Sequence, residues 1–123
     1  MIKNMNKKQK LGIDGEIIVA QFLIKKNFKI IDKNYRTKLG EIDLIAQKND
    51  TICFIEVKTR KKSYFPISNV ITWAKQQKII KAAQLFIIEN KIKDKVCRFD
   101  VATVIVSGYK FDIEYLKNAF QEI

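Results

Sequence analysis

The sequence predicts a small mixed α/β domain in which helices flank a central mixed five-stranded sheet, in the order αβββαββ. Two observations lead to this prediction. Two stretches carry apolar residues near helical spacing, and the rest of the chain holds short apolar runs bounded by turn residues. With 123 residues, 47% hydrophobic content and one proline, we expect a single compact domain over residues 1–123. Residues 1–8 are expected to form a basic, flexible tail.

The first helix and strand are predicted before residue 33. A helix is expected over residues 8–26, and Asn27 suits the left-handed conformation that often ends a helix. Gly15 lies within this helix, where glycine costs about 1 kcal/mol relative to alanine, so it suggests close packing or approach to another chain. A short strand over residues 28–32 and a basic loop over residues 33–40 follow.

Residues 40–60 predict a β-hairpin that closes at Asn49-Asp50. With a two-residue turn, Lys48 lies opposite Thr51, and alternate side chains lie on opposite faces of the hairpin. One face then carries Glu41, Asp43, Ile45, Phe54, Glu56 and Lys58, and the other carries Ile42, Leu44, Ala46, Cys53, Ile55 and Val57. The second face is apolar throughout, whereas the first becomes charged toward its open end.

The second half of the chain predicts a helix and two more strands. Thr72 is a suitable N-cap for a helix that continues to about Asn90. The longest strand is expected over residues 96–106, and a turn leads into a strand over residues 109–113. The segment 114–120 is predicted as a short closing helix.

The charge of the chain predicts a polyanionic partner. Lysine and arginine number 24 against 13 acidic residues, a net charge of +11. Such an excess favours nucleic acid, which we expect to be DNA, over a membrane surface. The alternative is a compositional bias toward lysine codons in an AT-rich genome. No stretch approaches the ~20 apolar residues of a membrane span, and no signal peptide is evident, so we expect a cytoplasmic protein.

The hairpin poses an electrostatic problem that a metal ion would solve. The predicted register places Asp43 opposite Glu56, and like charges in such a pair are destabilising. Because the chain has no histidine and its two cysteines are isolated, a bound metal would be oxygen-ligated, Mg²⁺ or Mn²⁺. Lys58 shares the face of Glu56 and could approach a phosphate. The alternative is a solvated sheet end with a Glu41–Lys58 ion pair worth at most about 1 kcal/mol.

Several sequence blocks resemble a known family over most of the chain. These are "GIDGEIIVAQFL", "NYRTKLGEIDLIA", "CFIEVKTR", "VITWAKQQKI", "RFDVATV" and the closing "NAF". Together they resemble the YraN-like family of uncharacterised bacterial proteins, which is similar to the PD-(D/E)XK nuclease superfamily that includes Holliday-junction resolvases. The segment "YFPIS" departs from the Phe-Gly expected there, which puts the geometry of the substrate loop in question.

The resemblance implies roles for individual residues. Asp43 and Glu56 would be metal ligands, and Lys58 would activate water or stabilise charge. Glu16 resembles an additional acidic ligand, although an exposed glutamate paired with a lysine would look the same. Lys75 or Gln76, at the start of the second helix, would contact phosphate or water.

Basic and aromatic residues flank the open end of the predicted hairpin. The basic residues Arg36, Lys38, Arg60, Lys61 and Lys62 are candidates for nucleic-acid binding. Lys75 and Gln76 from the second helix are further candidates. Tyr35, Tyr64 and Phe65 could stack on bases. Asp100 and Trp73 are interpreted as structural.

Three hypotheses follow from the sequence. The first is a Mg²⁺-dependent endonuclease acting on DNA, including branched or junction DNA. The second is a nucleic-acid-binding module that retains the nuclease fold without cutting. The third, a small RNA- or ribosome-associated protein, explains the charge but leaves the Asp43–Glu56 pair unexplained. A junction-cutting enzyme would need a second active site, which a homodimer would supply.

Overall fold

The structure, a computed structural model, describes residues 14–61 and 71–121. Its elements are α2 (Gly15–Lys25), β1 (Lys29–Arg36), β2 (Glu41–Lys48), β3 (Thr51–Lys61), α3 (Trp73–Glu89), β4 (Val96–Ser107) and β5 (Lys110–Phe120). The predicted αβββαββ order is therefore confirmed. No helix among the described residues is long and apolar enough to cross a membrane.

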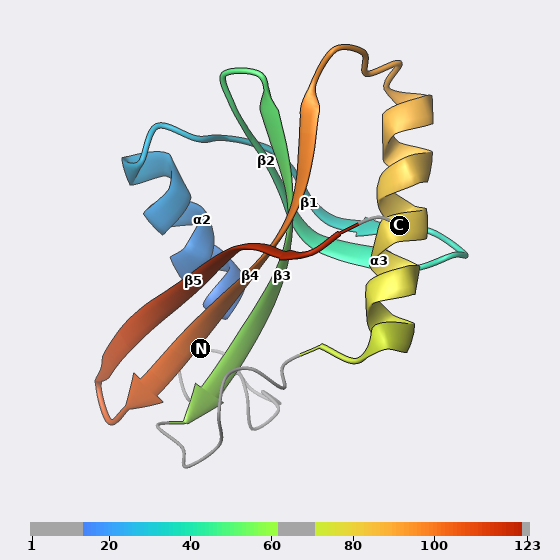
Figure 1. The fold of residues 1–123 in the computed structure, drawn as a ribbon. Helices are drawn as coiled ribbons and strands as arrows, with labels where there is room; N and C mark the ends of the chain where they lie inside the picture. Colours follow the sequence, from blue (N-terminus) through green and yellow to red (C-terminus); the bar gives the residue numbers. More distant parts are fainter. Residues whose placement is uncertain (1–13, 62–70, 122–123) are drawn as a thin grey trace, which may run out of the picture.

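The five strands form one mixed sheet in the order β1-β2-β3-β4-β5. Strands β3 and β4 run parallel, and every other neighbouring pair is antiparallel. The parallel pair needs a crossover connection, which α3 supplies. The helices α2 and α3 lie on opposite sides of the sheet, so the fold has three layers (Figure 1).

Each helix covers its own hydrophobic cluster. On one side Val19, Ala20 and Leu23 of α2 pack with residues such as Leu44 and Ile55. On the other side α3 packs Ile79, Ile80, Ala82, Ala83 and Phe86 against residues that include Ile45, Phe54 and Phe99. The sheet is thus buried on both faces, which explains the uninterrupted apolar run over residues 52–55 in the central strand β3.

The predicted hairpin register is confirmed near the turn and fails toward the open end. Lys48 lies opposite Thr51, and the pairing continues in register as far as Leu44 opposite Ile55. Beyond that pair β2 leaves β3 and continues alongside β1, where Arg36 lies opposite Glu41. The alternation of faces also breaks there, because Ile42 packs on the α3 side and not with Leu44. Glu41 accordingly pairs with Arg36, at 3.7 Å, and the expected Glu41–Lys58 pairing is wrong.

Three other predictions are corrected by the structure. Residues 33–36 extend β1 and do not belong to a loop. Trp73 is 70% exposed and so is not a packing residue. The segment 114–120 is part of strand β5 and not a helix. The last error has a physical reason: a seven-residue helix is marginal alone, whereas pairing with β4 satisfies the backbone of this segment and buries Phe120.

One feature expected of α2, its left-handed end, is present, and its N-cap is a finding of the structure. Asn27 has a φ of 70° at the end of the helix, in the left-handed region. The described helix begins at Gly15, and the Asp14 side chain caps it by accepting from the backbone N–H groups of Glu16 and Ile17. Residues 8–13 of the predicted helix lie outside the described residues.

Candidate functional site at the hairpin fork

The candidate site forms where β2 and β3 separate. Leu44 and Ile55 are the last paired residues, counted from the turn. Asp43 on β2 and Glu56 on β3 are the next residues away from the turn, so both lie at the fork. The backbone N–H of Val57 donates to Oδ2 of Asp43 at 2.8 Å. A strand that diverges from its neighbour leaves backbone groups without ladder partners, and here a carboxylate accepts one of them. This bond holds Asp43 against β3.

Glu56 is buried and bonded to two lysines. Its side chain is only 5% exposed, with Oε2 at 2.6 Å from the Lys75 ammonium and 3.5 Å from that of Lys58. Lys75 lies in the first turn of α3, a turn that contains no acidic residue. A cation there is disfavoured by the helix dipole, and Glu56 offsets that cost. The helix start is thereby tied to the sheet at the candidate site.

The side chains at the fork perturb one another's ionisation. Burial, followed by the charge of Glu56, raises the pKa of Asp43 from 3.8 to about 7, although the Val57 N–H acts in the opposite direction. Burial lowers the pKa of Lys58, and the neighbouring Lys75 lowers it further, against the attraction of Glu56. For Lys75, burial is outweighed by the hydrogen bond and charge of Glu56, so its pKa is raised. Two carboxylates and two ammonium groups therefore share one small, partly desolvated space.

Gly15 brings the start of α2 to this space. A Cβ atom at this position would overlap Oγ1 of Thr59 on β3, so a larger residue would push the helix away. Of the two alternatives predicted for Gly15, close packing is thus present within this chain. The adjacent Glu16 contributes charge that raises the pKa of Asp43. Among residues 14–61 and 71–121, however, no three Cys, Asp or Glu side chains gather closely enough to hold a metal ion by themselves.

Gln76 supports the start of α3. Its side-chain amide donates to the carbonyl of Ile71 at 3.2 Å, and its backbone N–H donates to the carbonyl of Thr72. The Thr72 hydroxyl accepts from the backbone N–H of Lys75, as its predicted role of N-cap requires. In this arrangement Gln76 orders the segment that carries Lys75, and its predicted contact with phosphate or water stays a prediction.

A basic cavity of about 500 Å³ lies beside the fork. It is formed by the β1–β2 loop and the first turns of α3, with Lys38, Lys75 and Lys78 as its basic residues and Glu41 as its acidic one. Sequence reasoning missed Lys78. The signal was available, since a residue three positions after Lys75 lies on the same face of a helix.

The remaining predicted basic residues lie at the ends of strands. Arg36 ends β1 and pairs with Glu41, whereas Arg60 and Lys61 end β3. Lys62, together with Tyr64, Phe65 and the rest of "YFPIS", lies outside the described residues.

Gly40 fixes the loop that borders this cavity. Its backbone N–H donates to Oγ1 of Thr37, which in turn donates to the Gly40 carbonyl at 2.8 Å. A Cβ atom at position 40 would overlap the backbone carbonyl oxygen of Lys78. We therefore expect Gly40→Ala to lower the free energy of unfolding by about 1–3 kcal/mol, measured by urea denaturation.

Gly108 offers a matched control for that substitution. It has a φ of 62° but open space around its Cα atom. Asparagine tolerates this conformation, so Gly108→Asn should cost less than about 1 kcal/mol. Equal losses in the two variants would contradict the contact between the loop and α3.

Comparison with known proteins places the chain in a family. The model for the family described as "Uncharacterised protein family UPF0102" matches residues 15–104. A UPF0102 protein of Alkaliphilus metalliredigens is 46% identical over 111 residues, covering 89% of this chain and 96% of that protein. A UPF0102 protein of Caldanaerobacter subterraneus subsp. tengcongensis is 43% identical over 123 residues, covering 97% of this chain and 100% of that protein. A third UPF0102 protein, from Dictyoglomus thermophilum, is 45% identical over 119 residues, covering 94% of this chain and 100% of that protein.

The matched segment includes all of the residues at the fork, from Glu16 to Lys75. The matches extend over nearly the full length of the relatives as well as of this chain. The protein therefore belongs to the UPF0102 family, the YraN-like family that its acidic and Glu-Val-Lys blocks resemble.

Proposed function

We propose that this protein is a metal-dependent nuclease that hydrolyses phosphodiester bonds in DNA. The observation that carries the proposal is the fork itself. Asp43 and Glu56 lie side by side at the point where β2 and β3 separate, and Lys58 and Lys75 flank them. The resemblance of these sequence blocks to PD-(D/E)XK nucleases supports the same assignment.

The residues at the fork fit Mg²⁺ or Mn²⁺. Mg²⁺ is commonly held by one or two carboxylates, with waters and phosphate oxygens completing its shell. Asp43 and Glu56 supply those two carboxylates, and their mutual repulsion is a cost that a divalent cation would remove. When bound, such an ion lowers the pKa of a coordinated water and neutralises charge on the phosphate. Glu16 would act through its charge, or through an intervening water.

The lysines would position and stabilise the phosphate. Lys58 is 3.5 Å from Glu56, close enough to reach a phosphate oxygen or an attacking water beside the two carboxylates. Lys75 faces both Glu56 and the basic cavity, so it would contact the phosphate on the neighbouring side. Lys38 and Lys78 would extend that contact along the strand. Together with Arg36, Arg60, Lys61 and Lys62, they would supply affinity that falls steeply with salt.

A cleavage assay tests the proposal. Duplex, single-stranded and four-way-junction DNA would be incubated with the wild type, Asp43→Asn and Lys58→Ala, in Mg²⁺, Mn²⁺ or EDTA. We expect cleavage by the wild type that requires metal and falls at least about 100-fold in both variants, while DNA binding persists. Asp112→Asn and Lys110→Ala change the same residue types on exposed parts of β5 and should cut like the wild type.

The alternative is a binding module that does not cut. The net charge of +11 favours this alternative as well, because it would attract DNA whether or not a metal is bound. In that case no DNA would be cut under any condition, and Asp43→Asn would bind DNA as well as the wild type or more tightly. That outcome would exclude the nuclease. Which of the three DNA forms is cut would also decide whether junctions are preferred.

A further inference from the structure

A second pocket lies at the opposite end of the hairpin from the candidate nuclease site. It has a volume of about 570 Å³ and is bordered by α2, the β2–β3 turn and the ends of β4 and β5. Lys48, at the turn, is five residues along β2 from Asp43, about 16 Å at the rise of a β-strand. None of the residues that line this pocket belongs to the fork.

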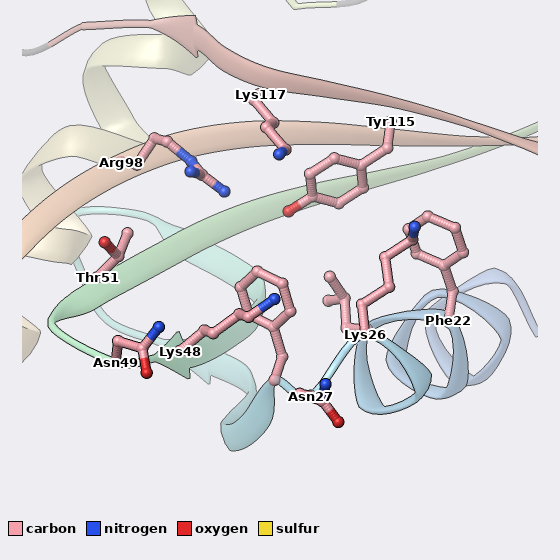
Figure 2. Close-up of a pocket in the computed structure, with 11 residues that line it drawn as sticks. Phe22, Lys26, Asn27, Lys48, Asn49, Thr51, Arg98, Tyr115 and Lys117 are labelled. Atoms are coloured by element: carbon pink, nitrogen blue, oxygen red, sulfur yellow. The ribbon is translucent and has the colours of Figure 1, made fainter.

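The pocket is strongly cationic. Lys26, Lys48, Arg98 and Lys117 all line it, and none of the described lining residues is acidic. Figure 2 shows the charged ends of Arg98 and Lys117 turned toward the same space, with Lys48 reaching it from the hairpin turn. Asp100 beneath the pocket balances one of these four charges, through Arg98. A group bound here would therefore be an anion.

Arg98 is held in position before any ligand arrives. Its Nε and Nη2 atoms donate to the two carboxylate oxygens of Asp100, at 2.9 and 3.0 Å. Asp100 is completely buried and also accepts from the Tyr115 hydroxyl and from the backbone N–H of Asn118. A guanidinium has five N–H groups, so three remain after the two bonds to Asp100. The side chain is 23% exposed, which leaves part of it open to the pocket.

Aromatic rings line the same pocket. Phe22 stacks on Tyr115 with 5.8 Å between ring centroids, and Phe28 lies on the side of the hairpin turn. The Lys26 ammonium lies 5.0 Å from the Phe22 ring centroid, and that of Lys48 lies 5.4 Å from the Phe28 ring centroid. Cation–π contacts at exposed sites are weak, so a bound anion can displace them. An anion would draw both ammonium groups toward itself and uncover the ring faces for a flat apolar group.

From these features we propose that the pocket binds a nucleoside monophosphate unit. The phosphate would contact Arg98, Lys48 and Lys117, and the base would pack against the rings of Phe22 and Phe28. A volume of about 570 Å³ lies within the range of small-molecule sites. The ligand is either a free nucleotide or the 5′-phosphorylated end of a strand. The proposal is independent of the nuclease proposal, because it uses none of the residues at the fork.

Binding would be measured from the amide chemical-shift changes of the ¹⁵N-labelled full chain at 150 mM NaCl. The probes are AMP, adenosine, inorganic phosphate and a 5′-phosphorylated pentanucleotide. We expect AMP to shift amides at Asn27, Asn49 and Lys117, and to bind at least about tenfold more tightly than adenosine or phosphate alone. The double variant Lys48→Gln/Lys117→Gln should weaken AMP binding at least about tenfold.

Controls separate this site from general attraction to a basic protein. The double variant Lys33→Gln/Lys110→Gln removes the same charge from exposed positions outside the pocket and should change AMP affinity by less than about twofold. Asp43→Asn should leave AMP binding unchanged, whatever it does to cleavage. Tighter binding of the oligonucleotide would assign the pocket to a strand end, and tighter binding of AMP to a free nucleotide. Inorganic phosphate binding as tightly as AMP, equal losses in the two double variants, or no shifts at the pocket would each overturn the proposal.

Discussion

Asp43→Asn is expected to make the metal-free protein more stable at pH 8, by about 1–3 kcal/mol, although it removes a residue of the candidate site. Asparagine can still accept the hydrogen bond from the Val57 N–H through its side-chain oxygen. It removes the negative charge that burial and Glu56 disfavour. The variant therefore keeps the local geometry and loses the repulsion.

The effect should depend on pH in a defined direction. The folded state raises the pKa of Asp43 to about 7, from an unfolded value of about 4. Below pH 4 the side chain is protonated in both states and costs nothing. As the pH rises from about 4 to about 7, the unfolded state loses its proton first, and the wild type loses stability. The variant has no such group, so its advantage should be absent at pH 4 and complete by pH 8.

Urea denaturation of both proteins between pH 4 and pH 8, in EDTA, measures this difference. Lys75 interacts with the charge of Asp43 and partly compensates it, which is why the expected gain lies below the value that the full pKa shift would give. Addition of Mg²⁺ should then stabilise the wild type and have little effect on the variant. An unchanged or lower stability of Asp43→Asn at pH 8 would contradict the described geometry of the fork.

Asp100→Ala is expected to lower the free energy of unfolding by about 3–5 kcal/mol, the largest loss that we predict for a single substitution. Asp100 is completely buried and accepts from Arg98, Tyr115 and the backbone of Asn118. The hydrogen bond and charge of Asp100 also raise the pKa of Arg98 above its ordinary value. Without the carboxylate, a largely covered guanidinium and two further donors would lose their acceptor.

The loss should be specific to the buried position. Asp112→Ala removes an exposed aspartate from β5 and should change the free energy of unfolding by less than about 0.5 kcal/mol. In the double variant Asp100→Ala/Arg98→Leu the unpaired charge is gone as well, so part of the stability should return. If the double variant were less stable than Asp100→Ala by the full cost of a second independent substitution, the pair would not be coupled.

Asn118 shows why β5 was predicted poorly. The pairing of β4 with β5 shifts register between Phe99 and Val101, and Asn118 there has a φ of 56°. Its backbone N–H donates to the Asp100 side chain in place of a ladder partner. A strand whose regular alternation is interrupted in this way has no clear period of two, so its sequence alone predicts a short helix.

Much of the fold was predictable from local patterns along the chain. Helical spacing, the Asn49-Asp50 turn and alternating apolar runs predicted the αβββαββ order and the register of the hairpin near its turn. The same patterns indicated that Asp43, Glu56 and Lys58 lie near one another. These features depend on contacts between residues close in the chain, where local periodicity and turn geometry set the result.

Which distant residues join Asp43, Glu56 and Lys58 depends on the packing of the whole domain. Lys75 reaches Glu56 because α3 crosses the sheet, and Ile42 changes face because β2 leaves β3 beyond Leu44. The cationic pocket combines α2, a hairpin turn and two later strands, a combination that no local pattern indicates. The physical reason is common to all three. They depend on how layers pack and strands twist to bury apolar surface on both faces of the sheet, which is a property of the whole domain.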